Sequence, residues 1–267
     1  MYYSDYHLHS NFSPDSKQDI DELVKKAISV GLKEIAITDH FEYDVVGFEE
    51  DFCLDLPRYS EKVLQLKSKY KSQIIIRMGV EIGAQPQLTE YFAAQLKEYP
   101  FDFVIASCHT IDKVDLYFCK VQEGRTLDEV QDIYFNNILK VVSSYDCFSV
   151  FGHLDYVTRY GGEKFRQLNY ERQKKTIDKI LTILIEKGKG IEINTSGFRY
   201  NEGRFYPHKD IIKRYFELGG EIITVGSDAH KASDIVKDFD KAYAFLSEIG
   251  IKYISIFENM KASFLKI

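Results

Sequence analysis

Short apolar runs alternate along the chain with longer segments that have the period of a helix. The strand-like runs are rich in β-branched or aromatic residues, and they cover Tyr2–His7, Glu34–Thr38, Ile74–Glu81, Phe101–Ser107, Phe148–Gly152, Gly190–Asn194, Glu221–Gly226 and Tyr253–Phe257. The helical segments cover Ile20–Val30, Pro57–Tyr70, Thr89–Tyr99, Leu127–Ser144, Asn169–Lys187, Pro207–Leu218 and Ser233–Ile249. Strands that alternate with helices are typical of parallel β/α folds. Seven or eight such units predict a parallel barrel.

Proline and glycine positions support these helix limits. Pro57 and Pro207 fall in predicted first turns, where the missing N–H costs nothing. Glycine follows four predicted helix ends, at Gly31, Gly188, Gly219 and Gly250. No low-complexity segment, long linker or repeat interrupts the pattern. We therefore expect residues 1–267 to form one barrel domain.

The composition narrows the class of protein. Of the 267 residues, 45% are hydrophobic and 28% are charged, which is typical of a soluble globular chain. The net charge of −6 and the lack of a basic run argue against binding to long nucleic acids. No apolar run is long enough to cross a membrane, and the start lacks the features of a signal peptide. These observations predict a cytoplasmic protein with no membrane partner, and they carry no signal for an oligomeric state.

Six of the seven histidines lie directly after predicted strands. They are His7, His9, His40, His109, His153 and His230. Glu81 ends a further strand, and Asp228 follows the same strand as His230. His208 lies at the start of a helix and is expected to be a structural or surface residue. Because the carboxyl ends of parallel strands meet at one end of a barrel, we expect the six histidines and two carboxylates to converge there.

The spacing of these residues predicts a metal site. In extended backbone, residues i and i+2 point to the same face, so His7 and His9 can reach one ion, as can Asp228 and His230. Imidazoles and carboxylates without thiolates suit Zn, Mn or Fe, and the four cysteines have no metal-ligand spacing. The donors exceed what one ion can use. Two or three divalent ions are expected, with a carboxylate such as Glu81 between them.

Taken together, six motifs carry a family resemblance. They are His7-Leu-His9, Thr38-Asp39-His40, Gly79-Val-Glu81, Ser107-Cys-His109, Gly152-His153-Leu-Asp155 and Gly226-Ser-Asp228-Ala-His230. With these motifs in this order, the chain resembles the polymerase and histidinol phosphatase (PHP) superfamily of metal-dependent phosphoesterases. The resemblance implies an α/β fold, a single distorted (β/α)7 TIM-like barrel with a metal site at the C-terminal ends of its strands.

The resemblance also implies a ligand set for each ion. The first ion would be bound by His7, His9, Glu81 and Asp228. The second would be bound by Glu81, His109 and His153. The third would be bound by His40 and His230, with Asp15 in place of a histidine that other PHP proteins carry and this chain lacks. Asp39 would orient an imidazole from behind, as carboxylates do for metal-bound histidines, or would instead be an N-cap or turn residue.

Within that superfamily, the chain most resembles the group that hydrolyses histidinol phosphate in histidine biosynthesis. The expected reaction is the release of phosphate from this monoester, by in-line attack of a metal-bridging hydroxide and without a phospho-enzyme. Glu81, Asp228 and His230 are expected to act directly in catalysis. The expected partner is thus a small phosphorylated substrate, L-histidinol phosphate.

Two arginines after predicted strands are candidates for binding the phosphate. Arg159 and Arg199 lie in strand-end loops, where a guanidinium can hold phosphate oxygens with two hydrogen bonds. The alternative is that they are solvated surface residues. The substrate ammonium group has three possible acceptors, which are Asp155, Glu42 and Glu163. The irregular stretches Phe41–Leu56, His109–Thr126 and Thr195–Tyr206 are expected to form the walls of the substrate site.

Three other functions compete with this hypothesis. A PHP-type nucleotide phosphoesterase or exonuclease keeps the fold and changes the substrate, and the net charge does not exclude a mononucleotide. An amidohydrolase-type hydrolase is disfavoured, because that family expects a bridging lysine after the fourth strand, whereas the bridging candidate here is Glu81 after the third. A metal-binding protein without catalysis is disfavoured because all but one of the expected ligand positions are filled.

Overall fold

Parallel strands form a nearly closed barrel. The computed structural model describes residues 2–48, 52–200 and 202–267. Within these residues, seven strands pair in the order β1 (Ser4–Asp5), β2 (Glu34–Ile37), β4 (Ile75–Gly83), β5 (Phe103–Ser107), β8 (Val150–Phe151), β9 (Gly190–Asn194) and β10 (Ile223–Gly226). The short strand β3 (His40–Phe41) also pairs with β4. The seven-stranded parallel barrel predicted from the sequence is confirmed.

Backbone hydrogen bonds join the first and last strands of the barrel. The Tyr6 N–H donates to the carbonyl of Val225 at 3.1 Å, and the Ala229 N–H donates to that of His7 at 3.3 Å. The buried carboxylate of Asp5 accepts from the N–H groups of His7 and of Ser227. The motifs near the two ends of the sequence are thereby held side by side.

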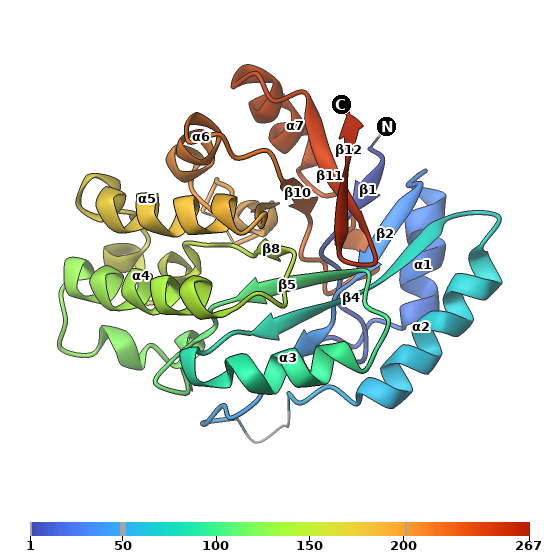
Figure 1. Ribbon diagram of the computed structural model, residues 1–267, viewed down its shortest axis with the longest axis horizontal. Coiled ribbons are helices and arrows are strands. Elements are labelled where there is room, and N and C mark those ends of the chain that lie inside the picture. Colours follow the sequence, from blue (N-terminus) through green and yellow to red (C-terminus); the bar gives the residue numbers. More distant parts are fainter. Residues whose placement is uncertain (1, 49–51, 201) are drawn as a thin grey trace.

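Helices surround the barrel (Figure 1). They are α1 (Ile20–Ser29), α2 (Leu56–Tyr70), α3 (Thr89–Lys97), α4 (Leu127–Ser144), α5 (Tyr170–Glu186), α6 (Lys209–Glu217) and α7 (Phe239–Glu248). Each buries one stripe of apolar residues, as α1 does with Ile20, Leu23, Val24 and Ala27. Gly188 and Gly219 follow the ends of α5 and α6 with φ of 65° and 90°, a backbone conformation that favours glycine, as the sequence predicts.

Two predicted helix starts are wrong. The last helix begins at Phe239 rather than Ser233, because Val236 and Asp238 have φ of 55° and 61°, which interrupts a helix. The Val236 N–H instead donates to Asp5. Helix α6 begins at Lys209, two residues after Pro207, because the side chain of His208 accepts from the N–H of Asp210 and caps the helix. This capping confirms the expected structural role of His208.

A β-hairpin closes the amino-terminal end of the barrel. The predicted eighth strand, β11 (Tyr253–Glu258), pairs antiparallel with β12 (Lys261–Lys266) instead of joining the barrel. Phe257 packs on Tyr6 and Phe103, with ring centroids 6.4 and 5.1 Å away. The Tyr6 hydroxyl donates to Glu34 Oε1 at 2.5 Å and accepts from the Phe257 N–H at 2.7 Å. The end of the barrel opposite the histidines is therefore filled.

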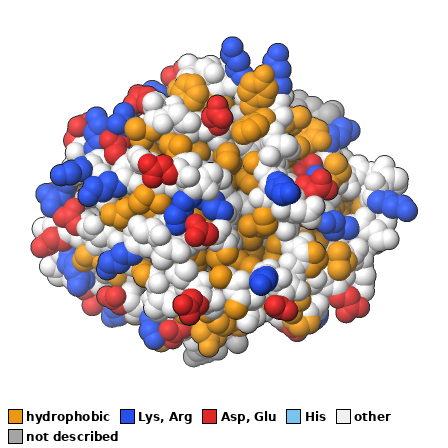
Figure 2. Space-filling model, in the orientation of Figure 1, with side chains coloured by type: hydrophobic (Ala, Val, Ile, Leu, Met, Phe, Trp, Pro, Cys, Tyr) orange, Lys and Arg blue, Asp and Glu red, His pale blue; other side chains and the backbone are white. Residues whose placement is uncertain are grey.

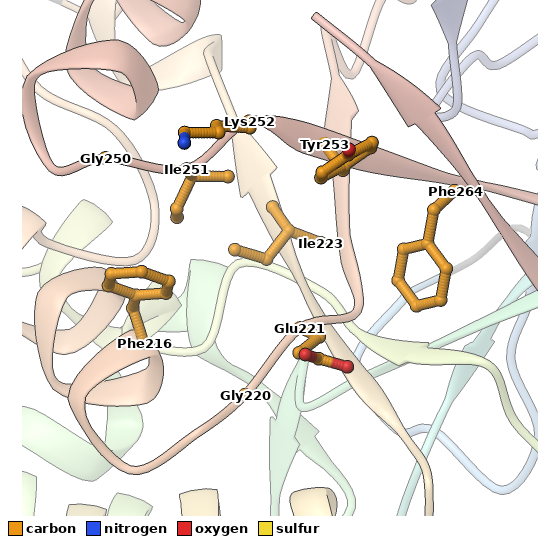
Figure 3. A pocket seen from close by; sticks show the side chains of 9 residues that line it. All are labelled: Phe216, Gly220, Glu221, Ile223, Gly250, Ile251, Lys252, Tyr253 and Phe264. Carbon is orange, nitrogen blue, oxygen red and sulfur yellow. The ribbon is translucent and has the colours of Figure 1, made fainter.

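A groove of about 490 Å³ lies beside this hairpin (Figure 3). Its lining consists of Phe216, Gly220, Glu221, Ile223, Gly250, Ile251, Lys252, Tyr253 and Phe264. The groove lies at the amino-terminal end of β10, whereas the predicted metal ligands follow the carboxyl ends of the strands. Its lining is mostly apolar and belongs to a different part of the molecule from the predicted site.

The surface charges and the helices bear on what the composition predicts about nucleic acids and membranes. On the face shown in Figure 2, acidic and basic side chains are interspersed with apolar ones, so positive charge does not gather there in a tract. Among the residues that the structure describes, no helix combines the length and the apolar character needed to cross a membrane.

Replacing Tyr6 with Phe should lower the free energy of unfolding by about 1–3 kcal/mol, because the buried Phe257 N–H loses its acceptor. Urea denaturation of the metal-loaded protein measures the change. The control is Tyr3→Phe, which removes a hydroxyl without a hydrogen bond among the described residues and should change stability by less than about 0.5 kcal/mol. Equal stability of the two variants would contradict the role given to Tyr6.

Candidate metal centre

All nine predicted ligands meet at the carboxyl end of the barrel strands. Eight come from the strand ends, namely His7, His9, His40, Glu81, His109, His153, Asp228 and His230. Asp15 comes from the loop between β1 and α1. The parallel pairing of β3 with β4 places His40 directly beside Glu81. Donors that are far apart in the sequence therefore become neighbours through strand register.

The first predicted ligand set forms a tight, buried cluster. His7 Nε2 lies 3.0 Å from His9 Nε2 and 3.2 Å from Glu81 Oε2. Asp228 Oδ1 lies 3.5 Å from His9 Nε2 and 3.8 Å from His7 Nε2. His7, His9 and Glu81 have no solvent exposure, and Asp228 is 5% exposed. His7, His9 and Glu81 each offer a ligand atom within 4.8 Å of the others, which is close enough for one ion to contact all three.

The second predicted set lies on the other oxygen of Glu81. Its Oε1 is 2.9 Å from His153 Nε2 and 3.3 Å from His109 Nε2. The two imidazole nitrogens are 3.4 Å from each other. The carboxylate of Glu81 thus presents one oxygen to each cluster, which is the arrangement needed for a bridging ligand.

The third predicted set lies at the rim. Asp15 Oδ2 is 3.1 Å from His230 Nε2 and 3.5 Å from His40 Nε2. The ring of His230 stacks on that of His9, with centroids 4.1 Å apart. Asp15, predicted as the substitute for a missing histidine, therefore lies beside both of its expected partners. Its side chain is 42% exposed, so this set is more open to solvent than the other two.

The hydrogen bonds behind His7 and His9 favour a cation between them. His7 Nδ1 donates to Glu192, so in a neutral His7 ring the lone pair lies on Nε2. Ser13 Oγ donates to Asp39, so His9 Nδ1 donates to Ser13 and the lone pair of His9 lies on Nε2 as well. The two Nε2 atoms are 3.0 Å apart, and they repel unless a proton or a metal ion lies between them. The donor set therefore fits a metal ion.

The shifted pKa values in the cluster also indicate that positive charge is needed between these side chains. Burial would raise the pKa of Glu81, but His7, His109 and His40 hold it well below its usual value. In turn, burial would lower the pKa of His7, and the carboxylates of Glu192 and Glu81 raise it well above the usual value. The buried carboxylates thus require positive charge. Protons can supply it, and a divalent ion that displaces them supplies more.

The chain matches known proteins over nearly its whole length. The family model described as PHP domain matches residues 5–196. The chain belongs to the PHP domain family. A histidinol-phosphatase of Lactococcus lactis is 34% identical over 263 residues, which are 96% of this chain and 95% of that protein. A histidinol-phosphatase of Bacillus subtilis is 24% identical over 254 residues, which are 86% of this chain and 94% of that protein.

A solved structure also matches this chain over nearly its whole length. Histidinol phosphate phosphatase from Lactococcus lactis, complexed with Zn, L-histidinol and phosphate, has a TM-score of 0.90 and 33% sequence identity to this chain. The match covers 98% of each chain. The family resemblance and the fold class predicted from the sequence motifs are confirmed. The roles of individual site residues stay predictions.

Two carboxylates of this PHP chain support the cluster and had no such role in the sequence-based prediction. Glu192 Oε1 lies 2.5 Å from His7 Nδ1, and Glu192 Oε2 accepts from the His153 N–H. Glu42 Oε1 accepts from His109 Nδ1 at 2.6 Å. Alternation along β9 predicts that Glu192 and Asn194 share a face, and a buried Glu in a central strand needs a partner. That signal could have identified Glu192.

Two glycines leave room for these carboxylates. A Cβ at Gly83 would overlap the Glu42 carboxylate, which occupies that space while it contacts His109. A Cβ at Gly226 would come within 2.5 Å of both His7 Cβ and Glu192 Oε1. The glycines are required by these close approaches, and they allow the supporting carboxylates to reach the imidazoles.

Two roles were predicted for Asp39, which were to orient an imidazole or to stabilise a turn. Its oxygens accept from the N–H and hydroxyl of Ser10 and from the hydroxyl of Ser13, without a direct hydrogen bond to an imidazole of the described residues. The Ser13 hydroxyl in turn contacts His9 Nδ1 at 3.1 Å. Asp39 thus orders the loop after β1, and its influence on His9 passes through Ser13.

Both predicted phosphate ligands converge on Asp228. Arg159 Nη2 lies 3.6 Å from Asp228 Oδ2, and Arg199 Nη2 donates to the Asp228 carbonyl at 2.7 Å. The two side chains are 9% and 11% exposed, which excludes the alternative that they are solvated surface residues. Arg159 Nε and Arg199 Nη1 are buried without a hydrogen-bond partner. Free N–H donors beside a metal cluster suit an anionic ligand.

The three suggested ammonium acceptors differ in their surroundings. Asp155 is buried and accepts from Arg204 at 2.9 Å, and Glu163 is exposed and does not line the cavity described below. Glu42 accepts from His109 through Oε1, lines that cavity and keeps Oε2 buried without a hydrogen-bond partner. Of the three, Glu42 therefore stays a predicted acceptor for the substrate ammonium group.

A cavity of about 370 Å³ opens beside the second and third clusters. It is lined by Asp15, His40, Glu42, Val45, Phe48, Phe52, His109, Asp115, Tyr117, Tyr156 and Tyr160. The stretches Phe41–Leu56 and His109–Thr126 contribute to it as expected. No described residue of Thr195–Tyr206 is among its lining residues, and that stretch instead places Arg199 against the Asp228 carbonyl. Positions 49–51 and 201 of these stretches lie outside the described residues.

Replacing Glu192 with Gln should weaken metal binding by about 10- to 100-fold, because the amide cannot accept all three hydrogen bonds that the carboxylate accepts. Titration against a chelator of known affinity measures the change. The matched control is Glu221→Gln, an exposed position at the opposite end of the barrel. Unchanged metal affinity in the Glu192 variant would remove Glu192 from the centre.

Proposed function

We propose that the protein is a metal-dependent phosphomonoesterase that hydrolyses L-histidinol phosphate to L-histidinol and phosphate in histidine biosynthesis. The observation that carries the proposal is the pair of buried arginines beside a cluster of imidazoles bridged by Glu81. This arrangement offers cation sites and free N–H donors to one phosphate group. The relative from Lactococcus lactis, whose structure contains Zn, L-histidinol and phosphate, supports the substrate and the metal.

The donor set suits two or three divalent ions, which we propose to be Zn, Mn or Fe. The proposed ligands are those expected from the sequence, with Glu81 shared between the first two sets and with Asp15 completing the third. When bound, adjacent divalent ions supply a hydroxide nucleophile near neutral pH and neutralise the charge of the phosphate.

The residues of the chain hold the substrate around these ions. Arg159 and Arg199 bind the phosphoryl oxygens, and their contacts with Asp228 fix the phosphate next to the first ligand set. Attack in line with the leaving oxygen then needs no phospho-enzyme. We place the leaving oxygen near His230 and Asp15, at the open rim of the cavity. Glu81, Asp228 and His230 are the residues proposed to act directly in catalysis.

Two further proposals complete this function. We propose that residues 1–267 act as one barrel domain, in which both ends of the chain contribute to the site. As an enzyme for a small phosphate ester of amino-acid biosynthesis, the protein would act in the cytoplasm, and nucleic acid is not an expected substrate.

A phosphate-release assay of the metal-loaded protein tests the function. L-histidinol phosphate, a mononucleotide and an oligonucleotide are compared at equal concentrations, and the metal-depleted protein is the blank. L-histidinol phosphate should have the highest kcat/KM. Equal or greater activity on either nucleotide would reject the histidine-pathway assignment in favour of a PHP-type nucleotide phosphoesterase or exonuclease.

Replacing Arg199 with Ala should lower kcat/KM for phosphate monoesters by about tenfold or more, chiefly through a higher KM, because a charged hydrogen bond to the phosphate is lost. Steady-state kinetics measure the change, and the metal content should stay unchanged. The control is Arg166→Ala, which removes an exposed arginine. An unaltered kcat/KM would show that Arg199 does not touch the phosphate.

A further inference from the structure

One carboxylate on the wall of the cavity has no assigned role. Asp115 lies in β7 (Val114–Asp115), which pairs antiparallel with β6 (Thr110–Ile111) directly after His109. This hairpin turns the chain back, so that Asp115 lines the same cavity as His109 and His40. Asp115 is not among the predicted metal ligands, and it lies apart from the phosphate-binding arginines around Asp228.

The two oxygens of Asp115 differ in their contacts. Oδ1 accepts from the Tyr117 N–H at 2.7 Å, which is an ordinary turn interaction. Oδ2 has no hydrogen bond to any residue that the structure describes. Burial raises the pKa of the Asp115 carboxyl and the neighbouring charge of Glu42 raises it further, whereas His109 and His40 lower it. Its negative charge is thus poorly compensated by the protein.

Aromatic rings form the wall next to this carboxylate. Tyr156 stacks on His153 with ring centroids 4.5 Å apart, and its edge meets Tyr160 at 5.4 Å. In the same lining, Phe48 packs on Phe52 at 4.9 Å. These rings suit a flat or apolar group better than a phosphate. The cavity therefore offers a place for the organic part of the substrate, whereas the two arginines proposed to bind the phosphate are not among its lining residues.

An anionic wall opposes the binding of an anionic substrate unless the substrate also carries positive charge. Metal ions would compensate Glu81, Asp228 and Asp15, whereas Glu42 is bonded to His109 through Oε1 alone and adds a second buried oxygen to the wall of the cavity. Asp115 would then face a phosphate dianion without a partner, which lowers affinity for a simple phosphate ester. A cationic nitrogen on the leaving group reverses the sign of that interaction.

We propose that Asp115 is a specificity-determining residue, which selects phosphate monoesters whose leaving group carries a protonated nitrogen by accepting a hydrogen bond from that nitrogen through Oδ2. The proposal rests on the proposed function and extends it to the recognition of the leaving group. It gives the substrate two recognition points, with the phosphate held at Arg159 and Arg199 beside Asp228 and the cation held at Asp115 in the cavity.

The test uses Asp115→Asn in the metal-loaded enzyme. Asparagine keeps the acceptor for the Tyr117 N–H, so the turn is preserved while the charge is lost. The matched control is Asp112→Asn, the same change at an exposed position of the same hairpin. Steady-state kinetics are measured with L-histidinol phosphate and with p-nitrophenyl phosphate, whose leaving group has no cationic nitrogen.

The expected result is a fall of about tenfold or more in kcat/KM for L-histidinol phosphate, chiefly through KM, with less than a twofold change for p-nitrophenyl phosphate. Asp112→Asn should leave both values unchanged. If Asp115→Asn affects both substrates equally or neither of them, the role of Asp115 is overturned while the proposed function stands. If the wild type hydrolyses p-nitrophenyl phosphate but not L-histidinol phosphate, the proposed function fails and this inference fails with it.

Discussion

The structure depends above all on the need to compensate a carboxylate buried in the mouth of the barrel. Glu81 has no solvent exposure, and an isolated charge there would cost several kcal/mol. Five histidines have a ring nitrogen within 3.5 Å of its oxygens, and they offset that cost only if cations are shared among them. Their rings are held in turn by Glu192, Glu42 and Ser13, so one buried charge organises two layers of side chains.

The two ends of the barrel differ in what fills them. At the amino end, Phe257 and Tyr6 fill the interior with aromatic rings, and the hairpin of β11 and β12 covers them. At the carboxyl end, glycines such as Gly83 and Gly226 reduce side-chain volume so that carboxylates can approach the imidazoles. Packing at one end thus gives a rigid frame for polar groups at the other.

The sequence predicts those parts of the site that depend on position along a strand. The ligands follow strand ends, and the parallel fold brings strand ends together, so His7 or His153 could be placed without coordinates. Alternation along β9 marks Glu192 as a buried carboxylate that needs a partner, but its contact with His7 across the barrel requires coordinates. The position of Asp115 requires them too, because it depends on a hairpin that folds back. The late start of α7 was missed because the positive φ values of Val236 and Asp238 come from tertiary contacts rather than from residue type.

The contact between β1 and β10 has a consequence for folding. It joins His7 to the Asp228 segment, which are more than two hundred residues apart in the sequence, through backbone hydrogen bonds and the shared acceptor Asp5. Closing so long a loop is slow compared with local helix formation. His7, His9 and Asp228, which are proposed to bind one ion, therefore come together only when β1 and β10 have paired. A chain in which this long-range contact has not formed lacks the complete proposed ligand set.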